Sequence, residues 1–274
     1  AKKALEFAKA SLTEVKRDNL PQSIRDDFDK YGVALAKINE NSDFMTQLAL
    51  EFPQIIGLTS DRRYLLLFQN NNELRPTGGF LGSYTVVELK GGKISKIDLD
   101  DVYNPDGQLK LSQANAEVKT PVALEQALDE ESLYIRNANW NPSFPASSQV
   151  INNLFKLVDG KGFDGVFAVD LYFARDLLSV LGPVYLTAYD EEIRVDNMYE
   201  RAQFHSDFDF KAGVSSKKAF MTVLGGKMLE SVFSLPQDKI PALLGVLYSS
   251  LEQKHILLDL YGTHLSKYLA EKGW

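Results

Sequence analysis

The stretch QNNNELRPTGGFLGSY, which starts at Gln69, places a polar, glycine-rich loop between two apolar runs. Gly78 and Gly79 would allow successive backbone N–H groups to form a concave site for an anion. Arg75 would add a guanidinium group that can bind a phosphate or pyrophosphate through two parallel hydrogen bonds. The polar side chains that would bind the hydroxyl or amide groups of a sugar are those of Asn70, Asn71, Asn72 and Thr77.

The same stretch has a purely structural interpretation. In that case Glu73 pairs with Arg75, the asparagines cap their own backbone, and the glycines permit close packing. A nucleotide-binding P-loop is excluded, because no lysine follows the glycines. The glycines also lead into the run SYTVVEL, which alternates with the period of a strand, so the helix that a dinucleotide fingerprint requires is missing.

A second candidate site is the acidic run KIDLDDVY, with Asp98, Asp100 and Asp101. In a strand, Asp98 and Asp100 share one face and Asp101 points away. A carboxylate pair beside a phosphate site can hold Mg²⁺ or act as a general base, so these acids are candidate catalytic and metal-binding residues. The alternative is an exposed strand end with solvated acids.

A third candidate is the loop RNANWNPSFP, which begins at Arg136. Trp140 can stack on the face of a sugar, and Asn139 can bind its hydroxyl groups. The alternative role for Trp140 is a loop anchor inserted in the core.

Two further groups of charged residues have simpler interpretations. Asp164 and Asp170 bracket the apolar run GVFAV, where capping is the ordinary role of an aspartate. Lys217 and Lys218 precede an apolar helical pattern and are expected at a solvated helix start, which Ser215 or Ser216 would cap.

The elements that must position these residues follow from the hydrophobic periodicity. Residues 1–57 show helical spacing and predict a helical hairpin or stalk, while residues 58–274 predict one α/β domain with a mixed sheet covered by helices. Gly91 and Gly92 join two alternating runs and predict a β-hairpin. The stretch NPDGQ predicts a turn, and PVYLTAY predicts a strand parallel to GVFAV after a right-handed crossover.

Composition excludes several classes of function. The formal net charge of −7 makes nucleic acid an unlikely partner, because an acidic surface repels phosphate backbones. The chain has no cysteine, so disulfides, thiolate metal sites and cysteine nucleophiles are absent. The chain starts at an alanine and is expected to be a piece of a longer protein.

The run YLLLFQNNNELRPTGGFLGSYTVVELKGGKI resembles the signature of a bacterial family of unknown function, domain family 4012. RNANWNPSFPASSQ and DGVFAVDLYFARDLLSVLGPV also resemble segments of that family, although Ser143 stands where an acid is expected. The resemblance implies a bacterial cell-surface protein whose membrane segment lies upstream of this sequence. It also implies a remote similarity to the LytR–CpsA–Psr proteins, which use arginines, acids and Mg²⁺ to transfer glycopolymers from a polyprenyl-diphosphate carrier.

The resemblance therefore leads to two expectations. One is an extracytoplasmic domain that binds, or also transfers, a phosphorylated or polyprenyl-linked glycan, with Mg²⁺ as a possible cofactor. The other is a non-catalytic surface module that binds peptidoglycan, polysaccharide or a protein. No arginine stands near KIDLDD, where the transferases combine an arginine with an acid at a strand end, and this departure favours the second expectation.

Overall fold

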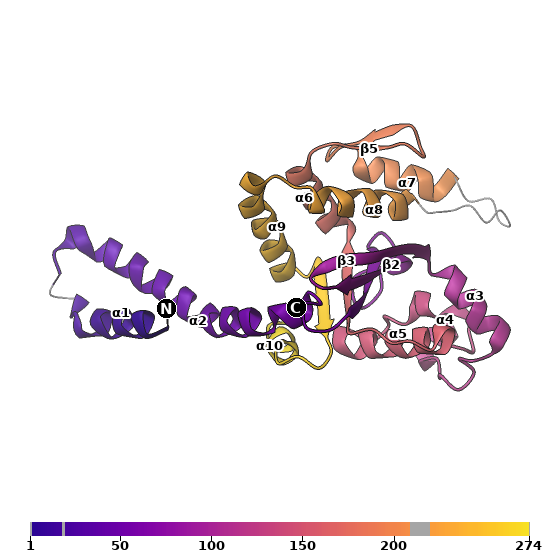
Figure 1. Cartoon of the computed structure of the whole chain (residues 1–274), viewed down its shortest axis with the longest axis horizontal. Helices are drawn as coiled ribbons and strands as arrows, with labels where there is room; N and C mark the ends of the chain where they lie inside the picture. Colours follow the sequence, from indigo (N-terminus) through magenta and orange to yellow (C-terminus); the bar gives the residue numbers. More distant parts are fainter. Residues whose placement is uncertain (1, 18–19, 209–219, 274) are drawn as a thin grey trace.

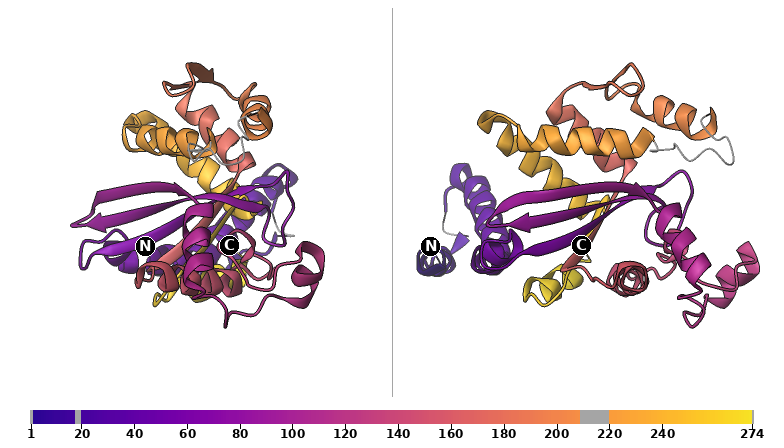
Figure 2. Two further views of the ribbon diagram at one scale, coloured as in Figure 1. Left: turned by 90° about the vertical axis from the view of Figure 1, so that its right-hand side faces the viewer. Right: turned by 45° about the vertical axis from the view of Figure 1, so that its right-hand side comes forward.

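The computed structural model describes residues 2–17, 20–208 and 220–273. At its centre is a five-stranded mixed sheet with the strand order β3-β2-β1-β4-β7. Its strands are β1 (Arg62–Asn70), β2 (Phe80–Lys90), β3 (Lys93–Asp101), β4 (Gly165–Asp170) and β7 (Ile256–Leu260). Helices cover both faces (Figures 1 and 2), which confirms the predicted α/β class.

Strand β1 occupies the middle of this sheet and explains the continuous apolar run in its sequence. It pairs in parallel with β4 and antiparallel with β2, and Leu65 and Leu67 are completely buried. The hairpin between β2 and β3 is confirmed. Gly91 and Gly92 both have positive φ values, +57° and +74°, which a two-residue turn of this kind requires.

The two faces of the sheet carry different helices. Helix α5 (Phe144–Asp159) packs on one face and buries Ile151 and Leu154 against β1 and β2. Helices α6 (Leu171–Leu181), α8 (Phe220–Phe233) and α9 (Ile240–Glu252) lie on the opposite face, above the sheet in Figure 1. The helix start predicted around Ser215, Ser216, Lys217 and Lys218 lies outside the described residues.

The strand predicted from PVYLTAY is present but lies in a different sheet. Strand β5 (Val184–Leu186) pairs antiparallel with β6 (Glu191–Ile193) in a small separate sheet next to α7 (Met198–Phe208). The predicted parallel crossover to β5 is therefore wrong. The parallel pair of the main sheet is formed by β1 and β4, which are far apart in sequence.

The turn predicted from NPDGQ is also wrong, because this stretch lies in helix α3 (Tyr103–Ser112). Pro105 sits in the first turn of α3, where a proline leaves no intrahelical donor missing. The short helix α4 (Val122–Leu128) follows α3 along the chain.

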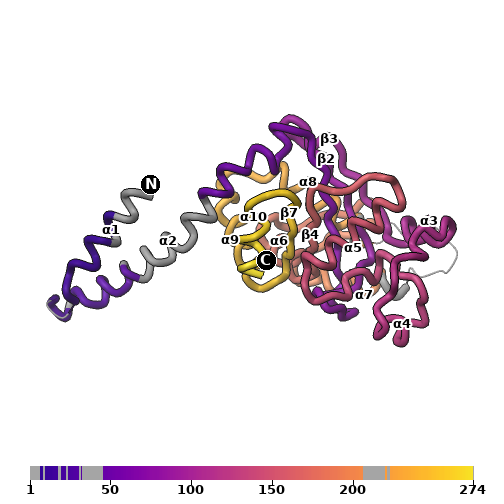
Figure 3. Tube along the Cα trace, turned by 90° about the horizontal axis from the view of Figure 1, so that it is seen from below, coloured from indigo at the N-terminus to yellow at the C-terminus, as the bar shows by residue number. Residues whose placement is uncertain are grey.

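The N-terminal part forms helices α1 (Lys2–Glu14) and α2 (Gln22–Ile55), which project from the domain with α1 folded back beside α2 (Figures 1 and 3). The end of α2 is docked on the domain. The carboxylate of Glu51 accepts hydrogen bonds from the amides of His264 and Leu265, at the start of α10 (Leu265–Lys272). Leu48 packs into the same small core, so the interior of the domain reaches back before residue 58.

No helix within the described ranges combines the length and the apolar character needed to cross a membrane.

Candidate functional site

Most of the side chains that are able to bind a ligand or take part in a reaction lie at one edge of the main sheet. Strands β1, β3 and β4 end at this edge, and β2 and β7 begin there. The parallel strands β1 and β4 are neighbours, and open α/β sheets bind ligands beyond the carboxyl ends of such strands. With strands about 4.8 Å apart, the edge measures about 19 Å from β3 to β7.

The loop between β1 and β2 is closed by its own backbone. The amide of Gly78 donates to the carbonyl of Arg75 at 2.8 Å, and the amide of Phe80 donates to the carbonyl of Glu73 at 2.9 Å. Gly78 has a φ of +135°, and a Cβ atom on Gly79 would lie 2.4 Å from the carbonyl oxygen of Asn70. The glycines thus serve close packing, and the bonded Gly78 amide does not fit the predicted anion nest.

Arg75 keeps a guanidinium group that no carboxylate neutralises within the described part of the chain. Its Nη1 donates to the Leu74 carbonyl at 2.9 Å, and Nε and Nη2 approach Asn137 Oδ1 at 3.4 Å. The predicted alternative, a pair with Glu73, is not formed. Arg75 therefore remains available to an anionic ligand.

The asparagines of the loop are mostly engaged with the loop itself. Asn70 Oδ1 accepts from the amide of Asn72 at 3.2 Å, and Asn70 Nδ2 approaches Glu73 Oε1 at 3.4 Å. This is the self-capping arrangement that the structural interpretation predicted. The exception is Asn71, whose buried Oδ1 has no donor among the described residues.

Thr77 and Asn139 are buried in a hydrogen-bond network that anchors the loop. Thr77 Oγ1 donates to Gln69 Oε1 at 2.8 Å, and Asn139 Nδ2 contacts Thr77 Oγ1 at 2.9 Å and the Gly79 carbonyl at 2.8 Å. Asn139 is 1% exposed. The predicted contact of Asn139 with a sugar does not fit this arrangement, because its amide nitrogen is bonded inside the protein and its Oδ1 is buried, with no donor among the described residues.

Arg136 is an internal structural residue rather than a ligand-binding one. Its guanidinium pairs with Asp106 at 2.9 Å and also with Glu130. Burial raises the pKa of Asp106, and hydrogen bonds from the Ile135 amide and from Arg136 oppose that shift. Trp140, the other predicted sugar contact of this loop, is partly buried against the main core, which corresponds to the alternative role of a loop anchor.

The predicted acidic site is dispersed. Asp98 is exposed and pairs with Lys96 at 3.0 Å. Asp100 accepts from Asn104 Nδ2 at 2.5 Å and from the amide of Asp101, and Asp101 accepts from the amide of Tyr103 at 2.9 Å. The residues that the structure describes contain no group of three or more metal-ligating side chains. This arrangement does not fit a Mg²⁺ site built on Asp98 and Asp100.

An aromatic pair that the sequence did not reveal lies between the two arginines. The rings of Phe80 and Tyr103 are 6.5 Å apart. The guanidinium of Arg75 lies 5.2 Å from the Phe80 ring, and that of Arg136 lies 5.9 Å from the Tyr103 ring. Tyr103 is 58% exposed. These four side chains, called the aromatic patch below, form a surface on which a planar or sugar group can stack.

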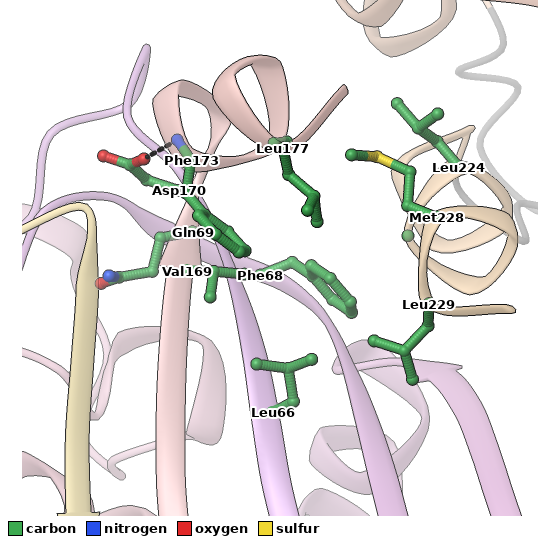
Figure 4. A pocket seen from close by; sticks show the side chains of 12 residues that line it. Leu66, Phe68, Gln69, Val169, Asp170, Phe173, Leu177, Leu224, Met228 and Leu229 are labelled. Carbon is green, nitrogen blue, oxygen red and sulfur yellow. Dashed lines mark hydrogen bonds between the residues drawn. The ribbon is translucent and has the colours of Figure 1, made fainter. Parts of the chain in front are cut away.

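An apolar pocket opens between the sheet, α6 and α8 (Figure 4). Its cavity volume is about 50 Å³, within about 490 Å³ of empty space that includes the part open to solvent. Figure 4 shows apolar side chains from β1, α6 and α8 around a common space, while the polar ends of Gln69 and Asp170 point away from it. The apolar lining side chains are Leu66, Phe68, Val169, Phe173, Ala174, Leu177, Leu224, Met228 and Leu229.

Two glycines allow α8 to pack closely on the sheet at this pocket. A Cβ atom on Gly225 of α8 would lie 2.8 Å from the ring of Phe68, and one on Gly226 would lie 3.1 Å from Leu99. The helix therefore approaches the sheet more closely there than a larger residue would allow. The only signal in the sequence was the pair of glycines inside an otherwise apolar helical pattern, VLGGKML.

A histidine–aspartate pair lies at the polar edge beside this pocket. Asp170 caps α6, as predicted, by accepting from the Phe173 amide at 3.0 Å. Its second oxygen lies 2.8 Å from His255 Nδ1. Asp164, the other bracketing aspartate, lies at the opposite end of β4 and pairs with Arg62 at 2.6 Å. The sequence could have drawn attention to His255 only through its position directly before the last strand.

The mixed sheet, with helices on both of its faces, defines an α/β domain. The family model "Protein of unknown function (DUF4012)" matches residues 59–204, which is more than half of the chain. The chain belongs to this family. No curated protein matches the sequence.

Solved structures show a distant similarity over about three-quarters of the chain. The transcriptional regulator yvhJ from Bacillus subtilis is 9% identical with a TM-score of 0.40, covering 77% of this chain and 74% of its own. Protein gbs0355 from Streptococcus agalactiae is 11% identical with a TM-score of 0.47, covering 78% and 73%. Lin1025 protein from Listeria innocua is 8% identical with a TM-score of 0.39, covering 76% and 77%.

Proposed function

We propose that this domain acts outside the cytoplasm and binds a phosphorylated, polyprenyl-linked glycan of the bacterial envelope. The apolar pocket is the observation that carries the proposal. It receives the polyprenyl chain, and the polar edge at the ends of β1 and β4 receives the head group. The acidic surface makes nucleic acid a poor alternative ligand.

The pocket suits a hydrocarbon chain because its lining is apolar on all three walls. Burying hydrocarbon contributes about 0.8 kcal/mol per methylene, so a five-carbon isoprene unit contributes about 4 kcal/mol before the cost of ordering it. A polar ligand would gain little there, because the amide of Gln69 and the carboxylate of Asp170 point elsewhere.

Arg75 supplies the contact with the phosphate groups. It lies two residues before Thr77, which is hydrogen-bonded to Gln69 at the rim of the pocket. A guanidinium without a carboxylate partner gains charge-assisted hydrogen bonds when a phosphate arrives. Attachment to the membrane through a segment outside this sequence would keep the domain near such a lipid and remains part of the proposal.

Calorimetric titration with farnesyl diphosphate tests the proposal. Ala174 lines the pocket, so Ala174→Phe should fill it and weaken binding by about tenfold or more, equal to about 1.4 kcal/mol. Ala123→Phe, on an exposed face of α4, is the matched control and should bind as the parent does. Absence of binding to the parent, or equal binding by Ala174→Phe, would show that the pocket is not a lipid site.

The aromatic patch supports a second candidate, a non-catalytic module that binds peptidoglycan or polysaccharide. The observation that supports this candidate is the exposed ring of Tyr103, which lies between Phe80 and Arg136. In that case Tyr103→Ala should reduce retention of the protein on purified peptidoglycan, and Ala174→Phe should leave it unchanged. The opposite pattern would favour the lipid-linked ligand.

A further inference from the structure

His255 is held in one orientation by a second residue at the edge of the sheet. Its Nδ1 lies 2.8 Å from Asp170 Oδ2, and the backbone carbonyl of His255 accepts from the Asp170 amide at 3.2 Å. Asp170 is itself fixed, since it caps α6 and is 8% exposed. The imidazole ring also packs against the ring of Tyr172 with centroids 4.9 Å apart.

This arrangement defines the chemistry of the imidazole. A carboxylate only accepts hydrogen bonds, so Nδ1 carries the proton and Nε2 presents a lone pair. Within the described part of the chain no side chain or backbone group bonds to Nε2, and 22% of the side chain is exposed. A carboxylate that orients an imidazole and stabilises its protonated form, with Nε2 open to a reactant, is the arrangement of a general base.

Aromatic and charged side chains surround the pair. Tyr172 is 41% exposed, and the guanidinium of Arg175 lies 5.5 Å from its ring, where it is paired with Asp176. Burial raises the pKa of Tyr199, whose ring packs 5.8 Å from Tyr172, to about 12, so its hydroxyl stays neutral. That hydroxyl is buried and has no hydrogen-bond partner among the described residues.

The pair also lies next to the apolar pocket. Asp170 and Phe173 contribute to the lining of the pocket, and Asp170 is paired in register with Gln69 of β1. A head group that reaches His255 must leave the pocket around Asp170, because the carboxylate that holds the imidazole points away from the apolar space.

We propose that His255 is a catalytic general base, positioned by Asp170, that activates a hydroxyl group for attack on the diphosphate of the bound lipid. This inference rests on the proposed function. The hydroxyl oxygen, from water or a sugar, forms a bond to the phosphorus that carries the glycan, and its proton passes to His255 Nε2. The bond from that phosphorus to the bridging oxygen breaks, and the bridging oxygen leaves with the electron pair as polyprenyl phosphate.

The test follows the cleavage of polyprenyl diphosphate N-acetylglucosamine by ³¹P nuclear magnetic resonance, with binding measured separately by calorimetry. His255→Gly should bind the probe as the parent does and lose turnover by about 10²–10⁴-fold. Free imidazole added to His255→Gly should restore part of the turnover, which a purely structural role of His255 would not allow.

Asp170→Asn is the matched variant for the positioning residue. Asparagine caps helices about as well as aspartate, so the thermal unfolding midpoint should change little. The kcat should fall while the KM for the probe stays the same, because asparagine no longer fixes the tautomer that presents the lone pair of Nε2.

The outcomes separate the two proposals. If the parent binds the probe but does not turn it over, or if His255→Gly retains full turnover, the catalytic inference is overturned and the lipid-binding function stands. If the parent does not bind the probe, both are overturned.

Discussion

Gly225 of α8 touches the ring of Phe68 on β1, so that a Cβ atom at position 225 would lie 2.8 Å from Cε1 and Cζ of that ring. Glycine in a helix interior is unfavourable by about 1 kcal/mol relative to alanine. This cost falls at the position where α8 packs against Phe68, which lines the apolar pocket. The close packing of α8 at the proposed binding site therefore depends on glycine at position 225.

Replacing Gly225 with alanine should close the pocket from the side of α8. The helix or the Phe68 ring has to shift, and binding of farnesyl diphosphate should weaken by about tenfold or more. Gly245→Ala in α9 is the matched control, because nothing lies within 4 Å of a Cβ atom there. It should raise the free energy of unfolding by about 0.5–1 kcal/mol and leave binding unchanged. Unchanged binding by Gly225→Ala would contradict the role assigned to this contact.

Gly79→Ala should destabilise the fold rather than alter ligand binding specifically. A Cβ atom there would lie 2.4 Å from the carbonyl oxygen of Asn70, so the backbone of the loop has to move. We expect a loss of about 2–4 kcal/mol in urea unfolding. Gly107→Ala, where a Cβ atom meets nothing within 4 Å, should not lose stability. A Gly79→Ala protein with the unfolding free energy of the parent would show that the loop accommodates a methyl group at this position.

The two arginines of the aromatic patch should differ in what truncation to alanine changes, stability for one and ligand binding for the other. Arg136→Ala leaves the buried Asp106 without its cation and should cost about 3–5 kcal/mol of unfolding free energy. Arg75→Ala breaks no ion pair in the described part of the chain and should cost under about 1 kcal/mol. It should instead weaken binding of farnesyl diphosphate relative to farnesol, compared by calorimetry. Equal losses of unfolding free energy in the two variants would contradict the assignment of Arg136 to a structural ion pair and of Arg75 to ligand binding.

Asp259 should make stability fall as the pH rises. Burial raises its pKa above the ordinary 3.8, and the hydrogen bond from Ser148 offsets only part of that shift. Because the folded protein holds this proton more tightly than the unfolded chain, the neutral form favours folding. Stability is therefore lost as the pH rises from the ordinary value through the raised one.

Asp259→Asn removes that titration while keeping the shape of the side chain. In urea unfolding between about pH 4 and about pH 7, the stability of the Asp259→Asn protein relative to the parent should grow with pH. Asp98→Asn, at an exposed position, controls for the general effect of one charge. A difference that shrinks with pH would mean that the carboxylate is favoured in the folded state.

The sequence predicted the sheet well because its periodicities are local. The apolar run of β1, the glycine hairpin of β2 and β3, and the alternation of β4 with α6 each needed only neighbouring residues. The position of β5 could not be predicted in this way. Whether a short strand joins the main sheet depends on which strand occupies the place beside β4, and β7, more than 80 residues along the chain, takes it.

The candidate site was predicted only in part, for a related reason. Residue type made both Arg75 and Arg136 candidate anion-binding residues, but it did not reveal that Arg136 is neutralised by Asp106 and Glu130 while Arg75 has no carboxylate partner in the described part of the chain. Nor does a sequence show that Asn139 is buried or that His255 faces Asp170, 85 positions away. Partners of this kind come from different helices, strands and loops, and they meet only in the folded domain.

Glu51 is one of several contacts that join the projecting arm to the rest of the molecule. It accepts hydrogen bonds from amides at the start of α10, and α10 follows β7, whose other end carries His255. Leu48 packs into the same small core, and the carbonyls of Gln54 and Ile55 accept hydrogen bonds from Arg62 and Tyr64 of β1. The end of the arm is therefore joined directly to β1 and, through α10, to β7, the strand that follows the proposed base.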